Sequence, residues 1–175
     1  MSAYLQALCA HANTPMQRLF LVPGNHDVDT SNTKRTECIT RLTDWRCQDY
    51  DSKVGLISPE DLSLLQSDHE NFLNFVEGLL GGNRRKAYTQ PHFVITTDEI
   101  NVLHADSTLT YLPTKERELI LGSHSLMDAL AQCDKQKPTI LLTHYSFDYL
   151  TQQERNEVAF LLQSYNVQLW LAGHE

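Results

Sequence analysis

Three short apolar runs of the sequence each lead to side chains that can bind a metal ion or transfer a proton. The first run is followed by a Pro-Gly pair and then by Asn25, His26 and Asp27, and two later runs lead to His144 and to His174. In an open α/β sheet, groups just beyond the carboxyl ends of the strands gather at one edge. We therefore expect these side chains to meet around one point.

Their chemistry indicates a transition-metal site more than a calcium or magnesium site. Neutral imidazoles together with an amide oxygen suit Mn, Fe or Zn. A lone histidine at a strand end is commonly only hydrogen-bonded, so the signal lies in three strand ends that each offer a donor. A histidine left out of metal binding remains able to transfer protons, which contributes roughly 10²–10⁴-fold to catalysis.

Composition limits the classes of partner. A chain of 175 residues with 41% apolar content is long enough for one domain with its own core. The net charge of −8 argues against nucleic acid held by basic patches. It leaves room for a phosphate-ester substrate, because bound cations are often the largest local charges. No run approaches the ~18 apolar residues of a membrane span.

The four cysteines, Cys9, Cys38, Cys47 and Cys133, are not arranged in a Cys-x-x-Cys pair. We interpret them as reduced thiols of an intracellular protein, with a Cys38–Cys47 disulfide as the alternative. The N-terminus has no charged segment followed by a long apolar run, so no signal peptide is expected. The predicted location is the cytoplasm.

The elements that must position these side chains alternate between helix and strand, which is typical of an α/β sheet. Apolar runs and turn signals predict strands over residues 19–22, 139–142 and 167–171, and a hairpin over 92–97 and 100–105. Helical spacing and capping residues predict helices over 3–12, 35–48, 59–80, 124–134 and 152–165. The polar segment 28–57 is interpreted as an insertion over the site.

Other ionisable residues have simpler interpretations. His69 on a helix and His104 within a strand are expected to be structural. Asp106, at a strand end, either orients the site or caps a turn. The basic cluster at 84–86 is expected to be a solvated turn, with phosphate steering as the alternative.

Three segments resemble the signature blocks of one family. The segments Gly24-Asn25-His26-Asp27, Thr143-His144 and Gly173-His174-Glu175 resemble the third, fourth and fifth blocks of the calcineurin-like metallophosphoesterases. That family hydrolyses phosphate esters, monoesters or diesters, at a two-metal centre. The resemblance implies an α/β fold, a metallophosphoesterase-like αββα sandwich, which is incomplete in this chain.

The resemblance also implies roles for individual residues. Asn25 would bind the second metal through its amide oxygen, and His144 and His174 would be further ligands of the same ion. His26 would face the substrate phosphate as the catalytic residue. Asp27 matches the block and is expected to support it.

The sequence departs from the family pattern in two ways. The first block, Asp-x-His, and the second, Gly-Asp-x-x-Asp, have no counterpart here, and the second His of the fifth block would fall one place beyond Glu175. The resemblance implies two divalent ions, each Mn, Fe or Zn. This chain offers ligands for about one of them. We expect residues 1–175 to be a single domain truncated at both ends, from a longer enzyme with fused or associated domains.

Two alternatives to a two-metal hydrolase remain open. The first is a non-catalytic interaction or regulatory module that keeps the fold and binds one metal ion or none. The second is a single-metal hydrolase that uses Asn25, His144, His174 and a water in an open coordination position.

Overall fold

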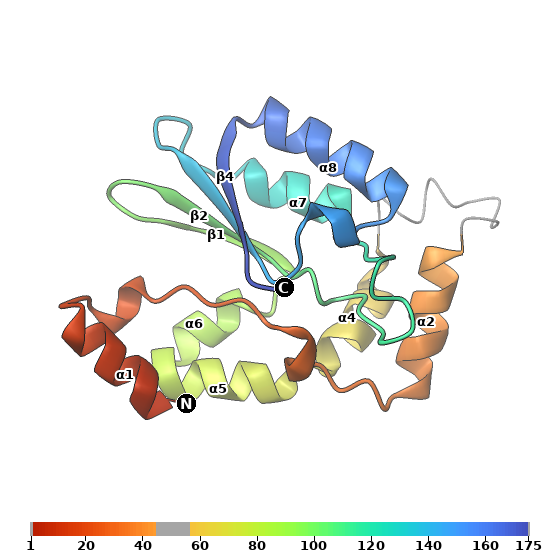
Figure 1. Ribbon diagram of the computed structural model, residues 1–175, viewed down its shortest axis with the longest axis horizontal. Helices are drawn as coiled ribbons and strands as arrows, with labels where there is room; N and C mark the ends of the chain where they lie inside the picture. The colour runs from red at the N-terminus through yellow and green to blue at the C-terminus, as the bar shows by residue number, and fades with distance from the viewer. Residues whose placement is uncertain (1, 45–56, 175) are drawn as a thin grey trace.

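The computed structural model describes residues 2–44 and 57–174, and its elements surround one four-stranded sheet (Figure 1). The strands are β1 His92–Thr96, β2 Asn101–Ala105, β3 Thr139–Thr143 and β4 Val167–Ala172, in the order β1-β2-β3-β4. β1 and β2 are antiparallel, whereas β2, β3 and β4 are parallel. The mixed α/β class and the hairpin predicted from the sequence are confirmed.

The helices follow the predicted positions closely, with a few differences. The α-helices are α1 Ser2–His11, α2 Thr33–Thr43, α4 Pro59–Ser67, α5 Glu70–Leu80, α6 Gly82–Ala87, α7 Ser123–Leu130 and α8 Gln152–Ser164. Three 3₁₀ turns are η1 Met16–Arg18, η2 Asn25–Asp27 and η3 Phe147–Tyr149. Within residues 2–44 and 57–174, no helix combines the length and apolar character needed to cross a membrane.

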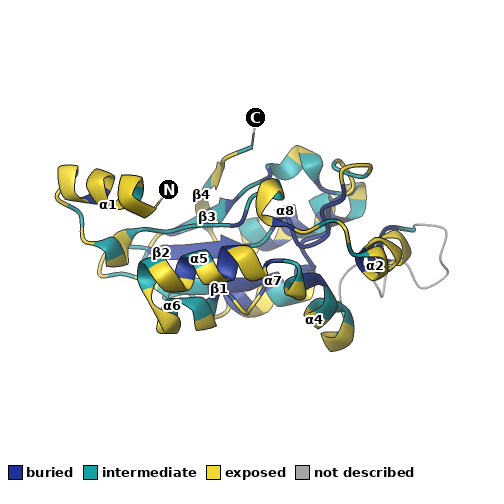
Figure 2. Ribbon diagram, turned by 90° about the horizontal axis from the view of Figure 1, so that it is seen from below, coloured by how far each residue is buried: buried dark blue, intermediate teal, exposed yellow. Residues whose placement is uncertain are grey.

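Helices cover both faces of the sheet (Figures 1 and 2). On one face α7 and α8 pack on the sheet through a core that includes Leu103, Leu141, Leu126 and Val158. On the other face α5 and the Tyr88 ring pack on β1 around Phe93. Burial of these side chains on both faces makes the sheet a rigid support for whatever follows its strands.

The parallel strands end at one edge of the sheet. Asp106 follows β2, His144 follows β3, and Gly173 and His174 follow β4. The backbone N–H groups of Gly173 and His174 donate to the His144 carbonyl at 3.0 and 2.8 Å. The ends of β3 and β4 are therefore tied together where the predicted site lies.

The strand predicted over residues 19–22 is wrong. This segment is extended but belongs to no strand of the described sheet. Side chains satisfy its backbone instead: Tyr88 Oη donates to the Leu21 carbonyl at 2.7 Å, and Arg84 donates to the Leu19 carbonyl at 2.8 Å. The apolar run, expected to be buried, is only partly buried, and tertiary contacts supply its hydrogen bonds.

The basic cluster is not a solvated turn. Residues 84–86 lie in α6, and Arg84 lies over the Phe20 ring at 5.5 Å while donating to the backbone of the preceding segment. Arg85 pairs with Glu70 at 2.8 Å. Both arginines act in the fold: Arg84 fastens residues 17–20 to α6, and Arg85 ties α6 to α5.

The helix predicted over residues 59–80 is broken into α4 and α5 at Asp68 and His69. Asp68 pairs with the buried Arg35 at 3.4 Å, and the His69 ring is drawn toward the loop after β2. The apolar spacing continues through the break, although Leu65 of α4 packs in one core cluster and Phe72 and Val76 of α5 pack in another. The cause of the break is therefore tertiary.

Only part of the predicted insertion lies within the described residues. Residues 33–43 form α2, which is shorter than the helix predicted over 35–48, and residues 45–56 lie outside the described part. Cys38, Ile39 and Leu42 on α2 pack against Leu65 and the loop 107–122. The assignment of residues 28–57 as an insertion, and the domain boundaries, stay predictions.

Candidate metal centre

The turn that carries Asn25 and His26 closes on itself. The Gly24 N–H donates to Asp27 Oδ2 at 2.8 Å, and the Asp27 N–H donates back to the Gly24 carbonyl at 3.0 Å. Asp27 therefore holds the 3₁₀ turn η2 in shape, which is the supporting role expected of it. His26 lies on the exposed side of this turn.

Gly24 is needed because another chain segment comes close. A Cβ at this position would lie 3.3 Å from His144 Cε1 and 3.4 Å from His144 Nδ1. Its φ of −99° is open to any residue, so the requirement is space. The missing side chain lets the imidazole of His144 lie directly against the turn that carries Asn25.

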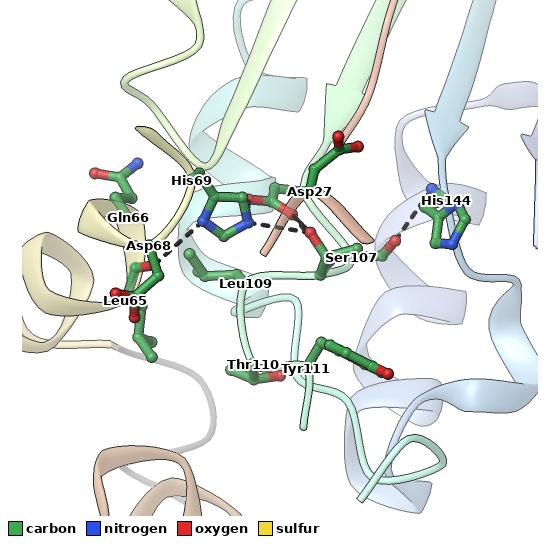
Figure 3. Close-up of polar contacts among 12 residues, drawn as sticks. Asp27, Leu65, Gln66, Asp68, His69, Ser107, Leu109, Thr110, Tyr111 and His144 are labelled. Atoms are coloured by element: carbon green, nitrogen blue, oxygen red, sulfur yellow. Dashed lines mark hydrogen bonds and ion pairs between the residues drawn. The ribbon is translucent and has the colours of Figure 1, made fainter. Parts of the chain in front are cut away.

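Backbone contacts fix the position of His144. The Ser107 hydroxyl accepts the N–H group of His144 at 3.1 Å (Figure 3). It also accepts the N–H group of Tyr145 at 2.9 Å. Ser107 is 1% exposed and follows β2, so one buried hydroxyl ties the end of β3 to the loop after β2. Both amides are satisfied in the interior, as buried N–H groups require.

Three donor atoms converge where the sequence predicted a site. His144 Nε2 lies 3.0 Å from Asn25 Oδ1 and 3.1 Å from His174 Nδ1. These residues are separated by 119 and 30 positions in the chain, so the contact is a product of the fold. The predicted convergence of Asn25, His144 and His174 is present.

The donor set fits a divalent transition metal. Two imidazole nitrogens and one amide oxygen are donors of the kind that Mn, Fe or Zn binds. Burial, and next the neighbouring His174, lower the pKa of His144, which favours the neutral imidazole that a metal requires.

The His174 ring lies among aromatic side chains. The Tyr145 ring is 4.4 Å from it, and the Tyr149 ring meets it edge-on at 5.3 Å. The guanidinium of Arg117 lies over the Tyr149 ring, 4.7 Å from its centroid. Aromatic packing on these sides restricts the rotation of the His174 imidazole.

A carboxylate stands at the far nitrogen of the same ring. Glu116 Oε1 is 3.5 Å from His174 Nε2 and accepts the Tyr145 hydroxyl at 2.7 Å. Burial first, and then Glu116, raise the pKa of Tyr145, so this hydroxyl stays a donor. Glu116 thus contacts both the ring and the tyrosine that stacks on it.

His69 and His104 have the structural roles expected of them, and Asp106 takes the second of its two expected roles. Asp106 Oδ1 accepts the Thr108 N–H and hydroxyl at 2.9 and 2.7 Å, which caps a turn. His69 Nε2 lies 3.1 Å from Thr108 Oγ1 and 3.3 Å from Asp106 Oδ2. Burial lowers the pKa of His104 to about 3, so this core histidine is neutral.

Sequence reasoning missed several residues of this centre. Ser107, Glu116 and Tyr149 were not singled out, although they hold the backbone or the rings of the donor histidines. Tyr145 could have been found, because it directly follows His144. Glu116 lies in the run Lys115-Glu116-Arg117-Glu118, which is indistinguishable in sequence from an ordinary solvated charge cluster.

Within residues 2–44 and 57–174, no group of three or more His, Cys, Asp or Glu side chains that could hold a metal ion is present. The centre described above differs from such a group, because its third donor is the amide of Asn25. It therefore rests on two imidazoles and one amide oxygen.

Comparison with known proteins supports one assignment. No curated protein and no solved structure matches the chain. A family model does match: it describes the calcineurin-like phosphoesterases and covers residues 2–175, almost the whole sequence. The mixed α/β sheet and the order of the three motifs agree with that match, and the chain belongs to the calcineurin-like phosphoesterase family.

Proposed function

We propose that the protein is a metal-dependent phosphoester hydrolase, acting on phosphate monoesters or diesters. Membership in the phosphoesterase family supports the reaction class. The observation that carries the metal site is that Asn25 Oδ1 and His174 Nδ1 lie 3.0 and 3.1 Å from the same atom, His144 Nε2. The proposed ion is Mn, Fe or Zn, in keeping with nitrogen ligands.

The site residues are proposed to have two kinds of role, namely binding the metal ion and transferring a proton. Asn25, His144 and His174 would hold one ion, and a bound ion of this type supplies charge stabilisation and a water of lowered pKa. His26, exposed on the same turn as Asn25, is proposed to face the phosphate and to protonate the leaving group. A second ion, as in a two-metal centre, would need carboxylate ligands beyond these three residues.

The location is part of the same proposal. Cys9, Cys38 and Cys133 are free thiols in the described chain, which supports a reducing compartment such as the cytoplasm. Cys47, the partner in the alternative disulfide, lies outside the described residues.

The test combines metal binding with hydrolysis. We expect calorimetric titration with Mn²⁺ or Zn²⁺ to give about one ion for each chain, and His174→Ala and His144→Ala to abolish tight binding. Turnover of p-nitrophenyl phosphate and bis(p-nitrophenyl) phosphate then separates monoesterase from diesterase activity. If the chain holds one ion tightly, or none, and hydrolyses neither ester, the result supports the alternative of a non-catalytic module. Activity that depends on one Zn²⁺ alone supports the single-metal hydrolase.

A further inference from the structure

We infer that Glu116 is a positioning residue that selects which nitrogen of His174 faces the metal centre. A histidine ring can present either nitrogen to an ion, and its other nitrogen usually donates to a carboxylate or carbonyl that fixes the tautomer. Glu116 lies at the Nε2 end of His174, and His144, which also contacts Asn25, lies at the Nδ1 end.

The placement of Glu116 is held by its second contact. The Tyr145 hydroxyl donates to Glu116 Oε1 at 2.7 Å, and the Tyr145 side chain is fully buried. The same oxygen is 3.5 Å from His174 Nε2, and the side chain of Glu116 is 37% exposed. A carboxylate oxygen accepts from several donors, so the tyrosine and the imidazole can share it.

Matching donors with acceptors then assigns the tautomers of His174 and His144 in the metal-free protein. An ionised carboxylate only accepts, so a neutral His174 carries its proton on Nε2 and offers the lone pair of Nδ1. His144 Nε2, 3.1 Å away, must then carry its own proton, which points toward His174 Nδ1 or Asn25 Oδ1. Binding an ion requires His144 to move that proton to Nδ1, whereas His174 is already in the binding form.

The role of Glu116 differs from the packing of the neighbouring aromatic rings on His174. Tyr145 and Tyr149 hold the plane of the His174 ring, but a flat ring held between rings can still turn over. Polar groups at the two edges distinguish the two nitrogens of the ring. His144 lies at Nδ1, and Glu116 is the carboxylate at Nε2.

The first experiment observes the ring without metal. In long-range ¹H–¹⁵N spectra of the metal-free protein at about pH 8.5, where imidazoles are neutral, we expect His174 to be the Nε2–H tautomer. Glu116→Ala should give a mixture of tautomers, and Glu116→Gln an intermediate spectrum. The matched control is Glu118→Ala, since Glu118 lies on the same loop, is 55% exposed and pairs with Lys115. An unchanged His174 spectrum in Glu116→Ala overturns the inference.

The second experiment measures the consequence for the ion. The role of Glu116 toward a metal rests on the proposed function, whereas its effect on the ring does not. We expect Glu116→Ala to weaken Mn²⁺ or Zn²⁺ binding by about 10–100-fold, Glu116→Gln by less, and Glu118→Ala by no more than about twofold. Glu116→Ala with wild-type affinity overturns the metal role.

The two results separate the proposals. A wild-type chain that binds no ion but shows the Nε2–H tautomer contradicts the metal function and supports Glu116 as the group that orients the ring. Thermal unfolding of each variant is measured in parallel, and Glu116→Gln, which keeps an acceptor for Tyr145, decides the question if Glu116→Ala does not fold.

Discussion

The role proposed for His26 rests on the side of the turn on which this residue lies. Its neighbour Asn25 faces His144, while His26 lies on the exposed side of the same turn. Two adjacent residues on one short turn can therefore divide binding from catalysis, because their side chains leave the backbone in different directions.

We expect His26→Ala to lower turnover at least about tenfold while the metal content stays at the wild-type level. The physical reason is that the lost group is proposed to transfer a proton and not to bind the ion. Steady-state hydrolysis of a p-nitrophenyl ester and metal analysis of the same sample measure the two effects, with the exposed His11→Ala in α1 as control. Loss of metal in the His26 variant would show that this histidine is a ligand.

At the residue scale, sequence reasoning worked where chemistry and local structure coincided. His144 and His174 follow apolar parallel strands, so their shared edge was predictable. Asn25 was placed correctly although its strand does not form, because the Pro-Gly break and the turn after it are local features. Glu116 and Arg35 were not predictable, since their partners are brought to them only by the tertiary fold.

Among the elements, α2 has an influence on the site through one buried cation. Arg35 is fully buried, and its guanidinium donates to the carbonyls of Leu65 at 2.9 Å and Leu109 at 2.8 Å, with Asp68 3.4 Å away. A single side chain thus joins α2 and α4 to the loop after β2. That loop carries Ser107, which holds the backbone of His144.

We expect Arg35→Ala to lower the free energy of unfolding by about 3–5 kcal/mol, because it leaves Asp68 and buried carbonyls without their partner. Urea unfolding followed by circular dichroism measures the loss. Lys34→Ala, at the exposed neighbouring position, is the control and should change stability by less than about 0.5 kcal/mol. Equal effects of the two substitutions would contradict this role for Arg35.

The helix α8 is tied to the start of α7 by a buried acid. Glu154 is fully buried, and its Oε2 accepts the N–H groups of Leu121 at 3.0 Å and Gly122 at 3.2 Å. Burial raises the pKa of Glu154 to about 8, despite these two hydrogen bonds, which lower it. The neutral acid is therefore the form that the fold favours near neutral pH.

This shift makes stability depend on pH. An acid whose folded-state pKa is raised binds more protons folded than unfolded, so stability is fully present below about pH 4.5 and is lost as the pH rises toward about 8. We expect Glu154→Gln to flatten that decline, because an amide does not ionise. Denaturant midpoints between pH 5 and 8 measure it, with the exposed Glu37→Gln on α2 as control. If stability falls as steeply with pH in Glu154→Gln as in wild type, groups other than Glu154 cause the fall.

At the scale of the whole molecule, the fold class could be predicted because it depends on the alternation of apolar runs and helical stripes. The pattern of parallel strands with crossover helices between them follows from that alternation. Details that depend on tertiary contacts could not be predicted, such as the break at His69 and the side-chain hydrogen bonds along residues 19–21. The site lies between these cases. Its donor residues could be predicted from the sequence, whereas the residues that hold them, such as Ser107 and Glu116, could not.

The donor atoms come from distant parts of the chain, so an ion that binds them should stabilise the entire fold. Asn25 and His144 are 119 positions apart, and an unfolded chain cannot hold them together. A ligand that binds only the folded state stabilises it by about 2.7 kcal/mol at a concentration 100 times its dissociation constant. For a domain of this size that corresponds to a rise in Tm of roughly 5–10 °C.

We expect Mn²⁺ or Zn²⁺ to produce this rise and Ca²⁺ to produce little, because imidazole nitrogens bind transition ions far better than calcium. Differential scanning calorimetry of the metal-free protein, with each ion added in turn, measures the shift. His144→Ala removes the central donor, so its Tm should be insensitive to all three ions, whatever its own starting stability. An equal shift with Ca²⁺, or one that persists in His144→Ala, would mean that the ions act elsewhere on this acidic chain and that the three converging donors hold no metal.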